Sequence, residues 1–295
     1  MKALVTGDWH LTDKQPVNRI DNYEEALFKK LKFISRTAQT NHCDCIIQPG
    51  DFFNQPNPSY EFFSKVIDEI KNMDMYIYTV MGQHDLKYRN AEDTALAALE
   101  KACPTLLLLG KTTHKNNWCI HGCSWGEPIP EPDPDYDFNI LIIHKMIVER
   151  KLWEDQEDFE YGELFLAKHK YDLIVSGDNH KAFSVSLGKR YLFNCGSLMR
   201  STIDQTEHFP IIFIFDTKDP LKVKTIPIPC EPSENIFRLE TVVKDKERNE
   251  KLEAFVSGLT LQKEMGLDFE NDLVTYESTN KIEEHLIRIR QECMR

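Results

Sequence analysis

No stretch of this sequence has the length and hydrophobicity of a membrane-spanning helix. Of the 295 residues 28% are charged, and none of the apolar runs approaches the roughly 20 residues that a bilayer crossing needs. The first apolar stretch, residues 3–6, passes directly into Gly7-Asp8 and lacks the longer hydrophobic region of a signal peptide. We therefore expect a soluble globular protein that has no contact with a membrane and works in the cytoplasm.

Cysteine and basic residues are both scarce. Eight cysteines in a chain of this length do not form a disulfide framework, so we expect reduced thiols, as is usual in the cytoplasm. Lys and Arg total 36 against 48 for Asp and Glu, which gives a formal net charge of −12. That charge repels polyanions at long range, so any contact with nucleic acid needs bound cations, a local basic patch or a partner subunit.

Short apolar runs alternate with amphipathic ones in the first half of the chain. This pattern is typical of strands separated by helices that pack on a sheet. It predicts strands at residues 2–6, 45–48, 75–80, 105–109 and 139–143, and helices within residues 23–34, 62–70 and 91–101. In the first helix Lys30 is the one polar residue at a position whose spacing calls for an apolar side chain.

The second half of the chain contains strands with short connections. They are predicted at residues 173–176, 183–187, 191–193, 211–215 and 222–226, and we expect them to form a second sheet. The proline-rich segment 127–137 should be a surface loop, and residues 227–232 read as a linker. We therefore predict a large domain at residues 1–228 and a small C-terminal region at residues 229–295, with a strand, a helix, a strand and a helix between residues 236 and 294.

Acids, imidazoles and an amide follow five of the predicted strands. They are Asp8 and His10, then Asp51, then Gln83, His84 and Asp85, then His144, and finally Asp178 and His180. Each has an ordinary explanation when taken alone, such as a turn carboxylate after glycine or a hydrogen-bonded histidine in a buried strand. Ligands of open α/β sheets bind beyond the carboxyl ends of the strands, so five such ends in succession indicate one shared site.

These residues have a family resemblance. The ordered set Gly7-Asp8-Trp9-His10, Gly50-Asp51, Gly82-Gln83-His84-Asp85, His144 and Gly177-Asp178-Asn179-His180 resembles the calcineurin-like metallophosphoesterases. The resemblance implies an α/β four-layer sandwich of two mixed β-sheets flanked by helices, with a small C-terminal α+β appendage. It also implies two divalent metal ions that activate a hydroxide nucleophile, with Mn²⁺ expected first and Mg²⁺ as the alternative.

The resemblance assigns roles to individual residues. It implies a first ion held by Asp8, His10, Asp51 and His180, and a second ion held by Asp51, Gln83, His144 and Asp178. His84, with Asp85 beside it, would be catalytic, standing near the scissile phosphate and assisting the leaving group as a general acid. The family usually has Asn in place of Gln83 and His in place of Asp178. Both substitutes offer oxygen, which favours manganese or magnesium.

Two further segments narrow the resemblance to one branch. Gly50-Asp51-Phe52-Phe53-Asn54, followed by Pro58-Ser59, and the later Asn194-Cys195-Gly196-Ser197-Leu198-Met199-Arg200 resemble the SbcD-type nucleases that process DNA ends. The resemblance covers about residues 1–228. It implies a DNA exonuclease or endonuclease in recombination and repair, a homodimer, and an SMC-like ATPase partner of the SbcC type.

Two alternatives stay open at this point. The protein could be a phosphoesterase for small phosphodiesters, or a non-catalytic binding platform in which Gln83 and Asp178 abolish the second ion. Six basic residues near the motifs could form a rim that binds the DNA backbone, or could be ordinary solvated surface charge, and the two readings have equal weight: Lys87, Arg89, Lys181, Lys189, Arg190 and Arg200. Cys119, His121 and Cys123 alternate on one face of a strand but lack the ligand spacing of a structural zinc site, so we expect buried thiols.

Overall fold

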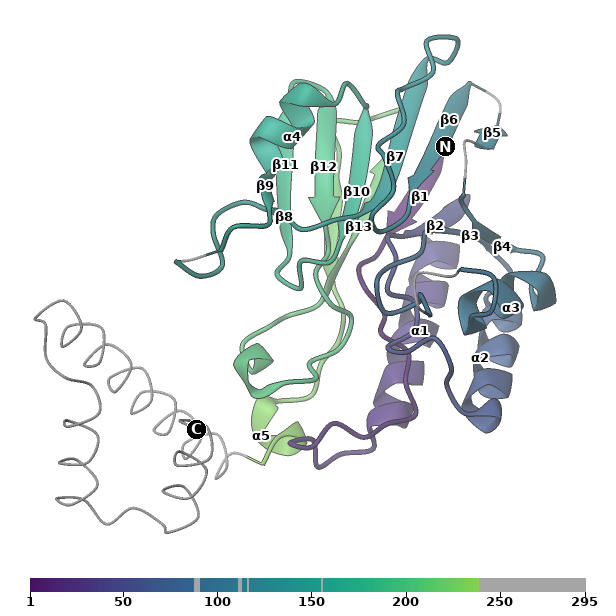
Figure 1. Cartoon of the computed structure of the whole chain (residues 1–295), viewed down its shortest axis with the longest axis vertical. Coiled ribbons are helices and arrows are strands. Elements are labelled where there is room, and N and C mark those ends of the chain that lie inside the picture. Colours follow the sequence, from purple (N-terminus) through teal and green to yellow (C-terminus); the bar gives the residue numbers. More distant parts are fainter. Residues whose placement is uncertain (88–90, 111–112, 116, 155, 239–295) are drawn as a thin grey trace, which may run out of the picture. The chain divides into compact units, whose positions relative to one another are not determined.

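Two six-stranded mixed sheets make up the centre of the fold (Figure 1). The computed structural model describes residues 1–87, 91–110, 113–115, 117–154 and 156–238. The first sheet has the order β14-β13-β1-β2-β3-β4. Its strands are β1 (Lys2–Val5), β2 (Cys45–Gln48), β3 (Tyr76–Thr79), β4 (Leu106–Leu108), β13 (Ile211–Asp216) and β14 (Lys224–Pro227). β1 to β4 are parallel to one another, and β13 and β14 run antiparallel to their neighbours.

The second sheet has the order β11-β12-β10-β7-β6-β5. Its strands are β5 (Thr113–Lys115), β6 (Trp118–Cys123), β7 (Phe138–His144), β10 (Leu173–Gly177), β11 (Phe183–Leu187) and β12 (Arg190–Asn194). β6, β7, β10 and β12 are parallel, and the two outer strands are antiparallel. A separate pair is formed by β8 (Ile147–Val148) and β9 (Glu160–Tyr161).

Helices cover the outer face of each sheet, so the fold has four layers. The helices are α1 (Tyr23–Thr40), α2 (Tyr60–Met73), α3 (Ala95–Ala102) and α4 (Gly162–Lys168), with a short α5 (Ser233–Ile236) and a 3₁₀ turn at Ile203–Gln205. Figure 1 shows α1, α2 and α3 beside the first sheet and α4 beside the second. Three helices start where a side chain accepts a backbone N–H: Asn22 caps α1, Ser59 caps α2 and Thr94 caps α3.

Alternation along the strands produces these layers. On β1, Leu4 packs in the cluster that faces the helices, whereas Ala3 and Val5 belong to the cluster between the two sheets. β10 repeats the pattern, since Leu173 and Val175 face the first sheet and Ile174 faces α4. Because successive side chains of a strand point to opposite faces, each strand is apolar on both sides and is buried between two layers.

The predicted four-layer α/β sandwich is confirmed in the described residues, and the positions of its strands are close to those expected. β2 and β11 have the predicted bounds, and the other predicted strands differ by one or two residues at their ends. The proline-rich segment 127–137 contains no helix or strand. The appendage predicted between residues 236 and 294 lies almost wholly outside the described residues, although α5 occupies the first position of the strand expected there.

The prediction of which strands share a sheet was wrong in two places. β13 and β14 were expected in the second sheet, but β13 pairs with β1 of the first sheet. β7 was grouped with the first half of the chain, but it lies between β6 and β10 of the second sheet. A short apolar run indicates a strand but not which strand pairs with it, and here the chain crosses between the sheets after β4 and returns after β12.

The segment expected to be a linker packs on the large domain. The first compact unit extends from Met1 to Phe237, beyond the expected boundary at 228. Ile228, Ile236 and Phe237 are buried, and the N–H of Ile20 donates to the carbonyl oxygen of Ile236 at 2.9 Å. In the described part of the chain, no helix combines the length and the apolar character needed to cross a membrane.

Replacing Phe237 by alanine tests this packing. Phe237 is 1% exposed and lies against the Arg19 guanidinium, so we expect Phe237→Ala to lower the free energy of unfolding by about 3 kcal/mol or more. Phe209 is 68% exposed, and the matched Phe209→Ala change should cost under about 0.5 kcal/mol. Urea unfolding measures both. Equal, small effects would show that residues 229–237 are a linker after all.

Candidate metal centre

The carboxyl ends of β1, β2 and β3 meet those of β7 and β10. Several hydrogen bonds tie the two sheets together at this edge, and two of them involve predicted ligands. The ring Nδ1 of His144, at the end of β7, lies 2.8 Å from the carbonyl oxygen of Pro49, which follows β2. The N–H of Asp178, after β10, donates to Oδ2 of Asp8, after β1, at 3.0 Å. The site is therefore built between the two sheets, from the carboxyl ends of strands of both.

Asp8, His10 and His180 form one group of candidate ligands. Each offers one ligand atom, and these atoms lie within 4.8 Å of one another. The Nε2 atoms of His10 and His180 are 3.0 Å apart, and Nε2 of His180 lies 3.8 Å from Oδ2 of Asp8. These three residues belong to the predicted first ion.

Asp51 lies between the two predicted ion positions. Its Oδ2 is 3.7 Å from Nε2 of His10 and 3.4 Å from Nε2 of His144. Its Oδ1 accepts the N–H of His84 at 2.9 Å, which leaves Oδ2 as the atom facing both imidazoles. This position agrees with the bridging role that the resemblance implies for Asp51.

Gln83 and Asp178 contact each other. The Gln83 amide donates from Nε2 to Oδ1 of Asp178 at 2.9 Å. These are the two positions at which the sequence departs from the usual residues of the resembled family. Because the two side chains are hydrogen-bonded partners, the two departures form one local change in the predicted second ion position.

Five buried side-chain atoms of the predicted ligands have no hydrogen-bond partner among the described residues: Asp8 Oδ1, His10 Nδ1, Asp51 Oδ2, Gln83 Oε1 and His144 Nε2. Buried polar atoms are nearly always paired, so five in one place require an explanation. With Nδ1 of His144 donating to Pro49, Nε2 is the ring atom that can offer a lone pair to a metal ion once an ion displaces its proton. Carboxylate and amide oxygens with imidazole nitrogens suit a divalent cation such as manganese, and the residues therefore fit the implied metal.

The electrostatics of the site also favour a cation. Burial raises the pKa of Asp8 well above its usual range, and the nearby Asp51 raises it further. Burial disfavours the charged form of His144, but attraction to Asp51 outweighs it and raises the pKa of the imidazole. At His10 burial dominates and lowers the pKa to about 3, so this ring is neutral and free to ligate. The negative potential that holds a proton on His144 would equally attract a divalent ion.

The backbone around the site is strained. Five described residues other than glycine have a positive φ: His10, His42, Asp51, Asp74 and Asp178. Three of them are predicted ligands, with φ values of 46°, 47° and 77° for His10, Asp51 and Asp178. Such residues cost about 1–3 kcal/mol each and cluster at functional sites.

Two glycines permit the ligands to approach the backbone. A Cβ on Gly82 would lie 2.1 Å from Oδ1 of Asp51, and one on Gly177 would lie 2.5 Å from Oδ1 of Asp8. Neither contact is possible for a real Cβ atom. The glycines of these two motifs are therefore required by the packing of the carboxylates.

His84 lies at the open side of the cluster. Its side chain is exposed, its ring centroid is 5.0 Å from that of His10, and its Nδ1 lies 3.1 Å from the carbonyl oxygen of Asn54. It also forms a possible ligand group with His10 and Asp51. Contact with Asn54 fixes the ring, and nothing in the sequence signalled that partner.

The Asp85 carboxylate is buried and binds backbone N–H groups of two loops of the site. Its carboxylate accepts the N–H groups of Phe52, Phe53 and Gly82 at 3.1, 2.8 and 3.0 Å. Burial raises its pKa to about 7, against the opposing effect of these donors. Asp85 thus joins the loop after β3 to the loop that carries Asp51, which is a positioning role.

The expected basic rim is only partly exposed. Lys181 and Lys189 are exposed, but Arg200 is 3% exposed and donates to backbone oxygens inside the fold. Arg190 donates to the carbonyl oxygens of Leu166 and His169. The seven described cysteines are free thiols, as predicted, and His121 is bonded to Asn139 at 2.9 Å.

The chain belongs to the calcineurin-like phosphoesterase family, since the family model of that description matches residues 1–182. Members of this family are metal-dependent hydrolases, in agreement with the ligand groups found here. Comparison with curated proteins finds no match.

Solved structures share the fold. A crystal structure of TT1561 of Thermus thermophilus matches with 13% identity and a TM-score of 0.51, covering 77% of this chain and 99% of that one. A putative 5′-nucleotidase from Staphylococcus aureus, solved with α-ketoglutarate, matches with 13% identity and a TM-score of 0.50, covering 84% of this chain and 58% of that one. At such identities the likeness concerns the fold alone.

Removing the Asp85 carboxylate should unfold the site. Asp85→Ala leaves the three backbone N–H groups of Phe52, Phe53 and Gly82 buried without an acceptor, at about 1–3 kcal/mol each. We expect a total loss of about 3 kcal/mol or more in urea unfolding. Asp93 is exposed, so Asp93→Ala is the control, and a loss at Asp85 no larger than that of the control would refute the positioning role.

Proposed function

We propose that the protein is a metal-dependent phosphodiesterase that acts as a DNA exonuclease or endonuclease in end processing. The observation that supports it most is the cluster of unpartnered side-chain atoms of Asp8, Asp51, Gln83 and His144 at one edge of the sandwich. Two divalent ions, Mn²⁺ or Mg²⁺, would be held by the seven predicted ligands, with Asp51 shared. When bound, such ions neutralise a phosphodiester and lower the pKa of a water molecule, which supplies the nucleophile.

The two segments that resemble SbcD-type nucleases contribute directly to the site. Phe52 and Phe53 present their N–H groups to Asp85, which fixes the loop after Asp51. In the later segment, Gly196 accepts the N–H of Asp8 at 3.2 Å and Leu198 donates to the carbonyl oxygen of Asp8 at 2.8 Å. Each of these segments therefore holds a predicted metal ligand in place. Their structural role supports assigning this chain the nuclease activity of the family branch that they resemble.

The partners and location are part of the proposal. We infer that the chain works in the cytoplasm as a homodimer with an SMC-like ATPase of the SbcC type, which would supply contacts to the DNA backbone. Such help fits the charge of this chain, because a net charge of −12 does not attract DNA.

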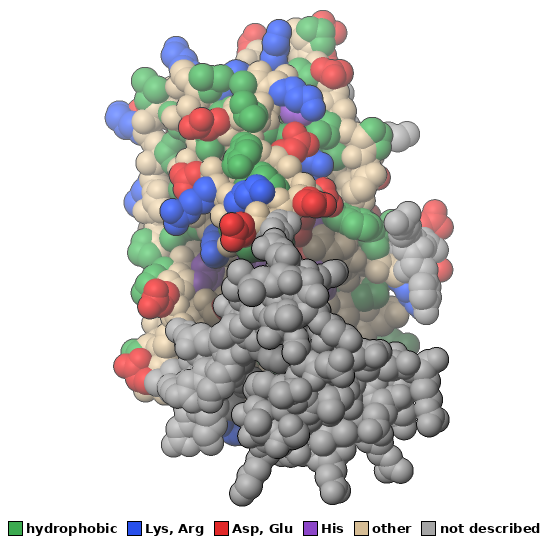
Figure 2. Space-filling view, turned by 60° about the vertical axis from the view of Figure 1, so that its left-hand side comes forward, with side chains coloured by type: hydrophobic (Ala, Val, Ile, Leu, Met, Phe, Trp, Pro, Cys, Tyr) green, Lys and Arg blue, Asp and Glu red, His purple; other side chains and the backbone are tan. Residues whose placement is uncertain are grey.

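The same charge favours a second candidate, a phosphodiesterase for small substrates. Figure 2 shows acidic and basic side chains interspersed over the face it presents, without a broad region of one sign. A small phosphodiester needs no extended basic surface. The two candidates share the metal centre and differ in what reaches it.

Digestion of DNA in the presence of manganese separates the candidates. We expect the wild-type chain to degrade linear duplex or single-stranded DNA and Asp8→Ala to be inactive, because Asp8 is a buried ligand candidate at the centre of the site. Turnover of bis-p-nitrophenyl phosphate without DNA cleavage would support the small-substrate candidate. Inactivity toward both substrates would support a non-catalytic binding platform and would contradict the enzyme proposal.

His84 should act in the reaction without being needed for the ions. Its exposed ring beside His10 can donate a proton to a leaving oxygen, a contribution of roughly 100-fold or more. We expect His84→Ala to keep its manganese affinity in calorimetry while turnover of bis-p-nitrophenyl phosphate falls by about that factor. Unchanged turnover would remove His84 from the mechanism, and loss of manganese binding would make it a ligand.

A further inference from the structure

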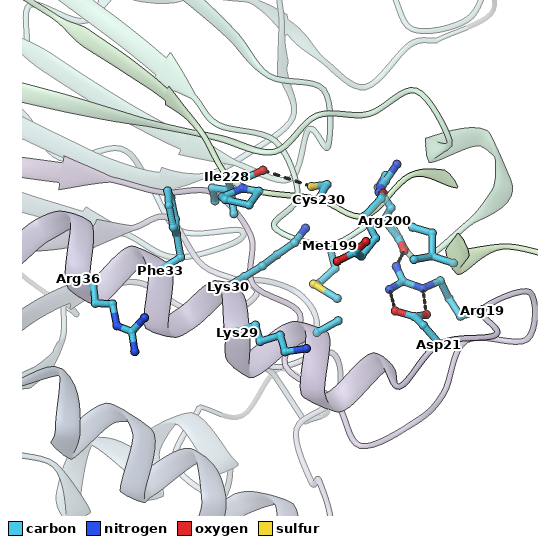
Figure 3. Close-up of a pocket in the computed structure, with 14 residues that line it drawn as sticks. Arg19, Asp21, Lys29, Lys30, Phe33, Arg36, Met199, Arg200, Ile228 and Cys230 are labelled. Atoms are coloured by element: carbon cyan, nitrogen blue, oxygen red, sulfur yellow. Dashed lines mark hydrogen bonds and ion pairs between the residues drawn. The ribbon is translucent and has the colours of Figure 1, made fainter. Parts of the chain in front are cut away.

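A pocket lies on the side of α1 that faces the C-terminal part of the large domain (Figure 3). It has a volume of about 310 Å³, within reach of the roughly 300–1,000 Å³ typical of ligand sites. Part of its wall is apolar and includes Phe33, Met199, Ile228 and Ile236. The rest of the wall is dominated by basic side chains, which is unusual in a chain with a net charge of −12.

Three cations of this pocket are buried. Arg19, Lys30 and Arg200 are 6%, 9% and 3% exposed. Arg19 pairs with Asp21 through two contacts of 2.7 Å. Among the described residues, Lys30 and Arg200 have no carboxylate within 4.0 Å. Both donate to neutral oxygens instead: Lys30 to the carbonyl oxygen of Leu198 at 2.7 Å, and Arg200 to Thr206 and Ser233. Three buried cations and one carboxylate leave a formal local charge of +2.

The exposed rim of the pocket does not cancel this charge. Two basic residues and one acidic residue stand there, Lys29, Arg36 and Glu231. Lys29 is also paired with Glu25 at 2.9 Å, so the rim has no net charge of its own, and solvent screens these exposed charges more strongly than the buried ones. The positive potential of the pocket therefore comes chiefly from its buried wall.

An uncompensated buried cation is costly, by several kcal/mol. Burial, together with repulsion from Arg200 and Arg19, lowers the pKa of Lys30 to about 8 despite the nearby Cys230. Figure 3 shows the Lys30 side chain extending from α1 toward Cys230 and Met199. The buried cations therefore give the pocket a positive potential that a small anion can reach.

We propose that this pocket binds a phosphate monoester. Such a group carries a charge of about −1.5 to −2 at neutral pH, which matches the excess on the buried wall, whereas a carboxylate carries only −1. Its oxygens can accept hydrogen bonds from the Lys30 ammonium, and its organic part can lie on the apolar wall beside Phe33 and Met199. Inorganic phosphate has the charge without the organic part and should bind more weakly.

The pocket is separate from the metal centre. Leu198 lies between them: its N–H donates to the carbonyl oxygen of Asp8, and its carbonyl oxygen accepts from Lys30. None of the seven predicted metal ligands lines the pocket. The proposal therefore does not rest on the nuclease assignment and can be tested on the full chain with metals removed.

Cys230 reports on occupancy in the unmodified protein. It lines the pocket and is half-buried, whereas the other six described cysteines are buried. We expect dAMP to slow alkylation of Cys230 by iodoacetamide, measured by peptide mass spectrometry in the presence of chelator. The rate should fall about tenfold when dAMP is at roughly ten times its Kd, because only the free pocket reacts. Inorganic phosphate should protect at higher concentration, and deoxyadenosine should not protect. An unchanged rate would overturn the proposal.

Two variants locate the binding. Lys30→Met keeps the apolar stem and removes the charge, so dAMP affinity in calorimetry should fall roughly tenfold or more. Lys32 is exposed on the same helix, and Lys32→Met should leave the affinity unchanged. Protection of Cys230 should survive in Asp8→Ala. Equal dAMP affinity in Lys30→Met would contradict binding in this pocket, and so would loss of Cys230 protection in Asp8→Ala. If Lys30→Met does not fold, the alkylation rate of the wild-type protein still tests the proposal.

Discussion

Two buried carboxylates, Asp8 and Asp51, determine most of what surrounds them. They are 1% and 0% exposed, close enough for each charge to act on the other, and each keeps an oxygen without a hydrogen-bond donor. Burial of like charges is unfavourable unless a cation compensates them. The imidazoles of His10 and His144 around Asp51, the left-handed backbone at His10 and Asp51, and the glycines against both carboxylates are consistent with a site shaped for that cation.

The sandwich makes this arrangement possible. Strands buried on both faces carry the ligands at their ends, and the Pro49–His144 and Asp8–Asp178 hydrogen bonds lock one sheet against the other. Because the ligands come from loops held at both sides, the strain at His10, Asp51 and Asp178 is supported by the packing beneath. Asp85 serves this purpose without touching the ligand atoms, by binding the loop backbone.

The sequence predicted the strands, and the residues that come together at their ends, better than the connections between the strands. Short apolar runs identify β1, β2, β7 and β10, and acids and imidazoles stand at their ends. The sequence does not reveal that β13 returns to β1, because the signal for a strand holds no information on its partner. Nor could it assign the Asn54 and Pro49 carbonyl groups that orient His84 and His144, since every residue has such an oxygen. Lys30, the polar residue in an apolar helical stripe, was visible in the sequence. The sequence did not show that Arg19, before the helix, and Arg200, far along the chain, lie close to it.

Anomalous scattering from crystals soaked in manganese tests the central claim most directly. If Asp8 and Asp51 are compensated by divalent cations, two anomalous peaks should appear, one beside Asp8, His10 and His180 and one beside Gln83, His144 and Asp178, with Asp51 between them. A single peak at the first position would show that Gln83 and Asp178 abolish the second site. No peak at either position would contradict the account.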